Sequence, residues 1–458
     1  MSVFAYFWMF FASAPDACMR YDRVIRTKNR KRFQTGGRQM TSRERVLTAF
    51  AHKEPDKVPV DFGGMCTSMV NCQVVAQLRD YYGLEKRLPK INDMCTMTAY
   101  VEPDLGEAMG VDVQQLYNFG DTYGHKNVEW KEWEYRGTPI LIPSNATLRD
   151  DGEGGTFVFP QGDDSVAPSG HFPADGYYFD NLERPDEDFD EDDPDPSGNV
   201  EDYMPVSEEQ IAFHHKVMEE IRPLNRAVQV GLCYSCLGDA NNIPGPNLKH
   251  PRGIRTIADW YMAPLLYPEM VEEVFEQGTD IAIENFKRYW EEFGSDIDIV
   301  YICGTDYGSQ NSLMMSTDTF EELYLPYYKK MNDWIHSNTT WKTLKHSCGA
   351  IFDMIPLLIE SGFDALNPVQ CSATGMDPKR LKDTYGKDIL FWGGGIDTQK
   401  VLPFGTPEEV RAQVLERLEI FSKDGGYIFN TIHNIQANTP IENIVAMVEA
   451  VKEFNGDK

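Results

Sequence analysis

The second half of the chain alternates between two hydrophobic patterns. Short apolar runs rich in β-branched and aromatic residues are followed by longer segments in which apolar residues recur every three or four positions. The short runs predict strands, and the longer segments predict amphipathic helices. The predicted strands lie at about residues 225–233, 296–304, 340–348, 365–371, 388–395 and 427–433. Six strand–helix units in succession require parallel strands joined by helical crossovers. Because these strands are apolar on both faces, the sheet should be covered on both sides.

The predicted helices follow these strands in order. They lie at about residues 268–294, 317–338, 350–362, 377–386, 406–423 and 440–456. We expect a bend at Pro326, inside the second of them, and an end at Gly362 for the third. Residues 41–62 predict one further helix followed by a first strand.

An open doubly wound sheet and a closed (β/α)8 barrel both fit this alternation. Polar and reactive residues recur at the carboxyl ends of the predicted strands, where barrel enzymes place their active sites. These residues are Cys303, Asp306, His346, Cys348, Gln370, Cys371, Asp397 and His433. No Gly-x-Gly-x-x-Gly sequence follows the first predicted strand, so a dinucleotide fold has no support. The sequence therefore predicts a single α/β domain, a (β/α)8 TIM barrel over residues 40–458.

Two stretches fall outside this pattern. Residues 144–206 are rich in Gly, Asp and Pro and contain an acidic run, which predicts a long solvated insertion in the barrel. Residues 1–39 carry the apolar run "VFAYFWMFFASA" and then a basic stretch. The run is too short to span a bilayer, and no Lys or Arg precedes it. We interpret residues 1–39 as a disordered extension or a mis-set start rather than a targeting signal.

Charge and cysteine content narrow the functional classes. The formal net charge is −29, which argues against nucleic acid or an anionic membrane surface as the main partner. The hydrophobic fraction of 41% is that of a globular protein with a sizeable core. Nine cysteines are scattered along the chain, and this odd number predicts free thiols in a reducing, cytoplasmic compartment.

The candidate chemistry centres on His346 and Cys348. Two residues apart on an extended segment, their side chains point to the same side. Imidazole nitrogen and thiolate sulfur suit zinc, and a catalytic zinc takes three protein ligands and keeps one position open. A third ligand would come from another strand end, where His433, Cys371 and Cys303 are candidates. A buried histidine beside a core cysteine would give the same pattern without a metal.

Other polar residues suggest contacts to a substrate. Asp306 and Gln310 lie in "GTDYGSQNS" after a predicted strand, where catalytic or substrate-binding groups belong, although a turn and helix cap would also explain them. The three glycines before Asp397 are not followed by Gly-Lys-Ser/Thr and so do not form a phosphate-binding loop.

Four segments together resemble the uroporphyrinogen decarboxylase (URO-D) superfamily. They are "TSRERVLTAFAHKEPDKVPVDFGG", "GTDYGSQNSLMMSTDTFEELYLPYYKKM", "HSCGAIFDMIPLLIESGFDALNPVQ" and "GGYIFNTIHNIQANTPIENIVAMVEAV". The resemblance covers roughly residues 41–455. It implies a single barrel with the active-site cleft at the carboxyl ends of the strands, and it is compatible with a homodimer.

One branch of this superfamily decarboxylates uroporphyrinogen without a metal. In these enzymes, arginines of a sequence motif near the first strand bind the substrate carboxylates. The matching stretch here, "VPVDFGGMCTS", contains no arginine. That departure weighs against this activity, although His433 lies where the decarboxylase also has a histidine.

The other branch comprises methyltransferases that exchange methyl groups with a corrinoid protein. Several resemble this chain in a His-x-Cys pair that binds zinc with a distant cysteine near the last strand. His346 and Cys348 match the pair, and His433 falls near the place of the distant cysteine, with Cys371 as the alternative. The resemblance thus implies a zinc-dependent methyltransferase that acts on a small methylated substrate or thiol with a corrinoid protein as partner. URO-D-type decarboxylation is the alternative.

Overall fold

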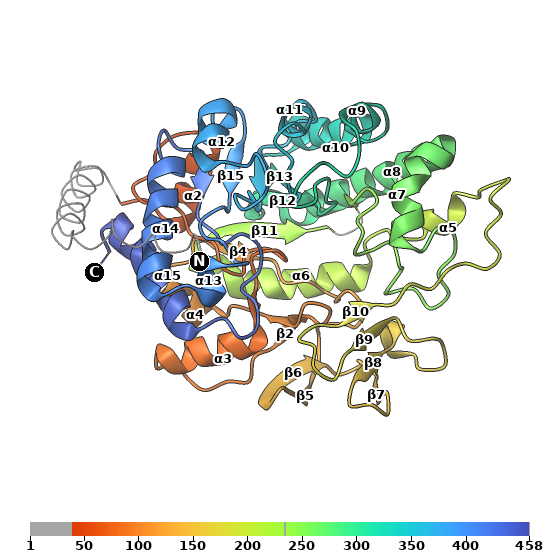
Figure 1. Cartoon of the computed structure of the whole chain (residues 1–458), viewed down its shortest axis with the longest axis horizontal. Coiled ribbons are helices and arrows are strands. Elements are labelled where there is room, and N and C mark those ends of the chain that lie inside the picture. The colour runs from red at the N-terminus through yellow and green to blue at the C-terminus, as the bar shows by residue number, and fades with distance from the viewer. Residues whose placement is uncertain (1–38, 233–234, 458) are drawn as a thin grey trace, which may run out of the picture.

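The computed structural model describes residues 39–232 and 235–457, and its centre is a curled sheet of seven parallel strands (Figure 1). The strands neighbour one another in chain order. They are β4 (Val113–Gln115), β11 (Ala227–Gly231), β12 (Ile299–Cys303), β13 (Lys342–His346), β14 (Ala365–Asn367), β15 (Leu390–Trp392) and β16 (Tyr427–Ile428). The parallel sheet and the last six strands agree with the sequence prediction.

A short segment lies between the first and last strands of this sheet. The Asp61 N–H donates to the Phe429 carbonyl at 2.9 Å, and the Phe429 N–H donates to the Pro59 carbonyl at 2.8 Å. On its other side, the Asp112 N–H donates to the Val60 carbonyl at 2.8 Å. The predicted first strand is therefore reduced to a single bridge, Val60 to Phe429. Proline has no N–H, and the Val60 N–H is bonded to the Asp112 side chain rather than to a strand, so no regular ladder forms. The predicted barrel is thus confirmed as far as a curled, seven-stranded parallel sheet.

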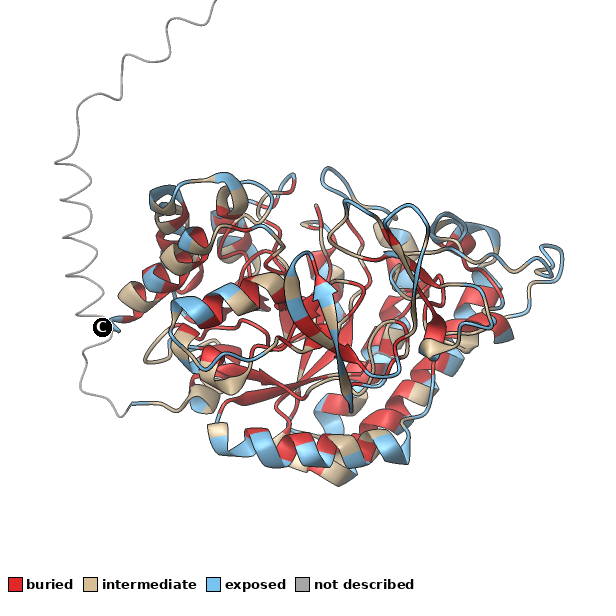
Figure 2. Cartoon of the chain, turned by 90° about the horizontal axis from the view of Figure 1, so that it is seen from below, coloured by how far each residue is buried: buried red, intermediate tan, exposed pale blue. Residues whose placement is uncertain are grey.

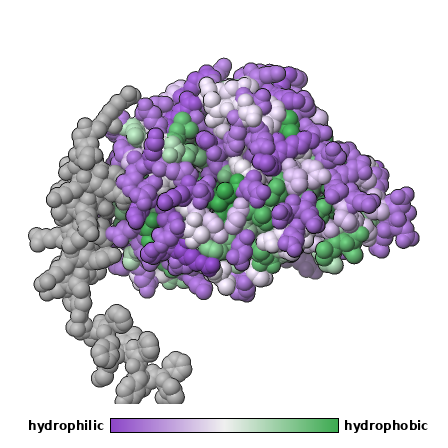
Figure 3. Space-filling view, turned by 90° about the horizontal axis from the view of Figure 1, so that it is seen from above, coloured by the Kyte–Doolittle hydropathy of each residue, from purple (hydrophilic) through white to green (hydrophobic). Residues whose placement is uncertain are grey.

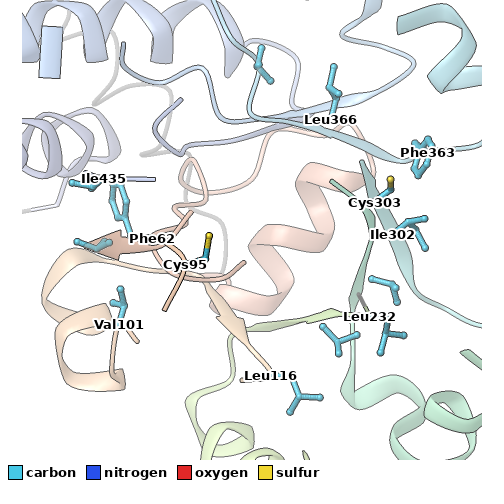
Figure 4. Close-up of a cluster of buried hydrophobic side chains, with 14 of the residues drawn as sticks. Phe62, Cys95, Val101, Leu116, Leu232, Ile302, Cys303, Phe363, Leu366 and Ile435 are labelled. Atoms are coloured by element: carbon cyan, nitrogen blue, oxygen red, sulfur yellow. The ribbon is translucent and has the colours of Figure 1, made fainter. Parts of the chain in front are cut away.

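Helices cover the outer face of the sheet, and their buried residues face inward (Figure 2). After β11 come α7 (Ile257–Leu266), α8 (Pro268–Phe293), α9 (Thr317–Leu323), α10 (Leu325–Asn338), α11 (Ile355–Glu360), α12 (Pro378–Tyr385), α13 (Val401–Phe404), α14 (Pro407–Phe421) and α15 (Ile441–Asn455). The predicted helix 317–338 is divided at Tyr324, and Pro326 lies in the first turn of α10, where its missing N–H costs little. Figure 4 shows part of the core beneath these helices, including Ile302, Phe363 and Leu366.

A separate core fills the inside of the curled sheet. Its members are Met65 and residues from alternate positions of the strands and from α2 (Ser42–Phe50), which contacts β4, β11 and β16. They are Val46, Ala49, Phe50, Met65, Val113, Ala227, Ile299, Tyr301, Leu344, Ala365, Leu390, Trp392 and Ile428. On β13 and β14, the residues two positions after Leu344 and Ala365 are His346 and Asn367. Their side chains face the same interior and lie closer to the carboxyl edge of the sheet.

The rest of the N-terminal half contains α3 (Cys72–Tyr81), α4 (Pro103–Met109), α5 (Ser197–Val200) and α6 (Glu208–Ile221). Three short strands, β1 (Val70–Asn71), β2 (Ile91–Asp93) and β3 (Thr98–Ala99), form one sheet, and β5 (Trp130–Tyr135) pairs with β6 (Thr138–Pro143). No helix in the described part of the chain is long and apolar enough to cross a membrane. Our interpretation of the N-terminal extension falls almost entirely on residues 1–38, outside the described residues.

The predicted insertion is more ordered than its composition suggests. Antiparallel strands β7 (Leu148–Asp150), β8 (Thr156–Val158), β9 (Gly170–Phe172) and β10 (Asp180–Asn181) form a small sheet. The middle of the acidic run is exposed, whereas Asn199 behind it is buried and exchanges hydrogen bonds with the backbone of Ile254.

Candidate metal centre

Three of the predicted site residues meet at the carboxyl edge of the sheet. His346 ends β13, Cys348 follows it by two residues, and His433 lies in the loop after β16. Their ligand atoms all lie within 4.8 Å of one another. His346 Nε2 is 3.4 Å from Cys348 Sγ, and the two imidazole rings are 5.2 Å apart at their centroids. In the described parts of the chain, this is the one group of three or more His, Cys, Asp or Glu side chains with the spacing of a metal site.

The protonation states of the two imidazoles suit metal ligands. Burial lowers the pKa of His346 to about 4. Burial, together with the neighbouring His346, lowers the pKa of His433 to about 4 as well. Both rings are therefore neutral at pH 7 and present nitrogen lone pairs.

The Cys348 thiol needs a cation before it can act as a thiolate. Burial, followed by the nearby Asp306 carboxylate, raises the pKa of Cys348 far above its usual range. A divalent ion at this place would offset both effects, because a coordinating thiol is deprotonated by the metal. Two neutral imidazoles and one thiol fit zinc, whose catalytic sites take three such ligands.

Two backbone hydrogen bonds fix the turn that contains Cys348 and Gly349. The Cys348 N–H donates to Asp306 Oδ1 at 2.7 Å, and the Gly349 N–H donates to Gln370 Oε1 at 2.7 Å. Gly349 has a φ of +92°, and a Cβ on it would lie against the backbone of Gly308, well inside van der Waals contact. The glycine after the His-x-Cys pair is thus needed for a close approach of two backbone segments.

The two predicted catalytic residues take different positions. Asp306 Oδ1 lies 3.7 Å from His346 Nε2, and its side chain is 39% exposed, so it borders the three ligands and remains accessible. Gln310 is exposed and binds other loops. Its Nε2 donates to the Ser372 carbonyl at 2.6 Å, and its Oε1 accepts from Gln370 Nε2 at 3.0 Å. Gln310 therefore links the loop after β12 to the loop after β14.

The two alternative third ligands lie elsewhere. Cys371 is not part of the group of three, and burial raises the pKa of its thiol to about 12. Cys303 contacts the Tyr328 hydroxyl at 2.8 Å and the Thr305 hydroxyl at 2.9 Å. Of the three candidates, the structure brings only His433 to the His-x-Cys pair.

Sequence reasoning missed Lys345 and Asn367. Lys345 is fully buried, and its ammonium donates to the carbonyls of Thr305 (2.6 Å) and His346 and lies 4.7 Å from the Tyr307 ring centroid. A lysine inside a strand that should be covered on both faces is the signal that could have revealed it. Asn367 Oδ1 contacts His346 Nδ1 at 2.6 Å.

Comparison with known proteins relates the second half of the chain to a known family. Residues 251–454 match the family model "Uroporphyrinogen decarboxylase (URO-D)". This region is a URO-D family domain, and it covers less than half of the chain. All three ligand candidates, Asp306 and Gln310 lie within the matched residues.

Proteins of two different activities are similar to parts of this chain. The methylated-thiol–coenzyme M methyltransferase of Methanosarcina mazei is 24% identical over 204 residues, which is 44% of this chain and 49% of that protein. The uroporphyrinogen decarboxylase of Coxiella burnetii is 30% identical over 98 residues, 21% of this chain and 25% of that protein. The matches thus span about half and a quarter of these relatives. A solved methyltransferase from Methanosarcina mazei shares the fold, with a TM-score of 0.53 and 17% identity, over 91% of this chain and 99% of that one.

Proposed function

We propose that this URO-D domain protein is a zinc-dependent methyltransferase. It would move a methyl group between a small methylated substrate or thiol and a corrinoid protein. The observation that carries the proposal is the meeting of His346, Cys348 and His433 within 4.8 Å. The similarity to the Methanosarcina mazei methyltransferase supports the same activity.

The residues around the proposed centre have separable roles. His346, Cys348 and His433 would hold the ion and leave one position open. The ion, when bound, supplies Lewis acidity that favours the thiolate form of a thiol or polarises a methyl-ether oxygen. Asp306 is partly exposed beside the ligands and would orient the substrate, and Gln310 would hold the loops around the site together.

The wider architecture belongs to this proposal. We take residues 58–62 as the eighth strand that closes the barrel, supported by the hydrogen bonds of Asp61 to Phe429 and Asp112 to Val60. Among the described cysteines, Cys72, Cys95, Cys303, Cys348 and Cys371 form no disulfide, which supports a cytoplasmic location. The open carboxyl edge of the barrel would receive the corrinoid protein, and a homodimer is compatible with this arrangement.

Uroporphyrinogen decarboxylation is the second candidate, because uroporphyrinogen decarboxylases are among the similar proteins. The segment 58–68 contains no arginine. A substrate with many carboxylates would need such cations in a protein of net charge −29. The methyltransferase therefore has the stronger support.

Zinc-supplied protein with free methylcobalamin as methyl donor and a small thiol as acceptor tests the activity. We expect loss of the methylcobalamin absorbance with the native protein and with the Cys371→Ser control, and none with Cys348→Ser, because a neutral hydroxyl is a poor zinc ligand. Equal rates for Cys348→Ser and native protein, or decarboxylation of uroporphyrinogen by metal-free protein, would contradict the proposal.

A further inference from the structure

Asn367 connects His346 to two other parts of the barrel. Its Oδ1 lies 2.6 Å from His346 Nδ1 and also accepts from the Thr67 hydroxyl at 2.9 Å. Its Nδ2 donates to the Trp392 carbonyl at 2.9 Å. Asn367 is fully buried and His346 is 3% exposed, so these contacts are shielded from water.

The orientation of the Asn367 amide follows from its partners. The Trp392 carbonyl can only accept a hydrogen bond, so the amide atom facing it is the NH₂ group. A flipped amide would place its oxygen against that carbonyl oxygen and leave both without a donor. The atom facing His346 is therefore the amide oxygen, which can only accept.

This orientation also selects the tautomer of His346. A neutral imidazole carries one N–H, and an acceptor at 2.6 Å from Nδ1 requires that proton to be on Nδ1. The lone pair then lies on Nε2, which faces Cys348 Sγ at 3.4 Å. The other tautomer would leave a buried Nδ1 lone pair against the Asn367 oxygen, an arrangement with no hydrogen bond.

We propose that Asn367 is a positioning residue that fixes the tautomer and ring orientation of His346, so that Nε2 is ready to bind a metal. The proposal rests on the metal centre of the proposed function. Hydrogen bonds to the second nitrogen of a metal-binding histidine fix its tautomer and raise its ligand strength. Here Thr67 and Trp392 hold Asn367, so the arrangement exists before any ion binds.

Nitrogen NMR of ¹⁵N-histidine-labelled, metal-free protein tests the proposal directly at neutral pH. We expect the His346 signals, assigned with His346→Gln, to show a protonated Nδ1 and an unprotonated Nε2. Asn367→Leu removes the acceptor and should shift His346 toward the Nε2–H form. Its zinc dissociation constant, from competition with a chelator, should rise about 10- to 100-fold. Asn367→Asp keeps an acceptor toward Nδ1 and should keep that nitrogen protonated, while its second oxygen takes the place of the amide that bonds the Trp392 carbonyl.

The control is Asn332→Leu. Asn332 is equally buried and donates to the Ser361 carbonyl at 2.7 Å, away from His346, so its loss should leave both the tautomer and zinc affinity unchanged. An Nε2–H His346 in the native metal-free protein, or native zinc affinity in Asn367→Leu, would overturn the proposal. If Asn367→Leu does not fold, the native and Asn367→Asp spectra decide. A native protein with the Nδ1–H form that binds no zinc would instead refute the proposed function alone.

Discussion

At the scale of single residues, the turn after Cys348 depends on one glycine. We expect Gly349→Ala to lower the melting temperature and to weaken zinc binding. The new methyl group would force apart the backbones at Gly308 and Gly349, and the Gly349 N–H holds the turn through Gln370. Calorimetry and a zinc titration of the same samples measure both effects.

Gly375→Ala is the matched control for this change. Gly375 also has a positive φ, but the nearest atom to an added Cβ is the Arg380 guanidinium at 3.8 Å. The free energy of unfolding of Gly375→Ala should fall by only about 1 kcal/mol, the strain of an alanine at positive φ. Its zinc affinity should equal that of the native protein. Equal effects of the two substitutions would show that the close approach at Gly308 is unimportant.

The sequence predicted the candidate ligands but not the residues that hold them. His346 and Cys348 were indicated by their residue types and spacing, whereas the third candidate stayed open between His433, Cys371 and Cys303 until the structure brought His433 to the pair. Asn367 acts through contacts with Thr67 and Trp392. Those partners are distant in sequence, so no local pattern predicts them.

At the scale of elements, α6 and α8 are joined by a buried histidine. His214 Nε2 donates to the Tyr117 carbonyl at 3.0 Å, and its Nδ1 accepts from the Tyr289 hydroxyl at 2.8 Å. Burial lowers the pKa of His214 from its ordinary value near 6.5 to about 4. Between these two values the unfolded chain binds a proton that the native protein does not, so the free energy of unfolding falls as the pH falls from 6.5 to 4.

We therefore expect His214→Gln to reduce the pH dependence of stability. Urea unfolding between pH 6.5 and 4.5 should give a slope smaller than that of the native protein by up to about 1.4 kcal/mol per pH unit. His215→Gln is the control, because the His215 side chain is 47% exposed. A native slope in His214→Gln would contradict the assignment of this proton.

Strand length alone does not decide which elements the sequence predicts. The α8 segment is long enough to reveal a helical repeat, and the short strands β14 to β16 are recognisable as apolar runs between amphipathic helices. Strands β7 to β10 are equally short but lie among Gly, Asp and Pro, so the sequence predicts a solvated insertion there. Aromatic packing orders that region, as between Trp133 and Phe172, whose ring centroids are 6.1 Å apart.

At the scale of the whole molecule, hydrogen exchange tests the closure of the sheet. The alternation of strands and helices predicted the barrel class, but it did not reveal that Val60 makes a single bridge. The cause is local: Pro59 has no N–H, and the Val60 N–H bonds to the Asp112 side chain. If residues 58–62 close the barrel, the amide hydrogens of Asp61, Asp112 and Phe429 should exchange as slowly as those of β12 and β13. Hydrogen exchange as fast as that of exposed loops would indicate an open edge. The face in Figure 3 is mainly hydrophilic, in keeping with the net charge of −29.

The zinc X-ray absorption spectrum of the native protein, supplied with one equivalent of zinc, tests the central claim most directly. We expect one sulfur neighbour at about 2.3 Å and two imidazole nitrogens at about 2.0–2.1 Å. The sulfur shell should disappear in Cys348→Ser and remain in Cys371→Ser. A spectrum without zinc–sulfur scattering, or one lost with Cys371 instead of Cys348, would contradict a metal centre built from His346, Cys348 and His433.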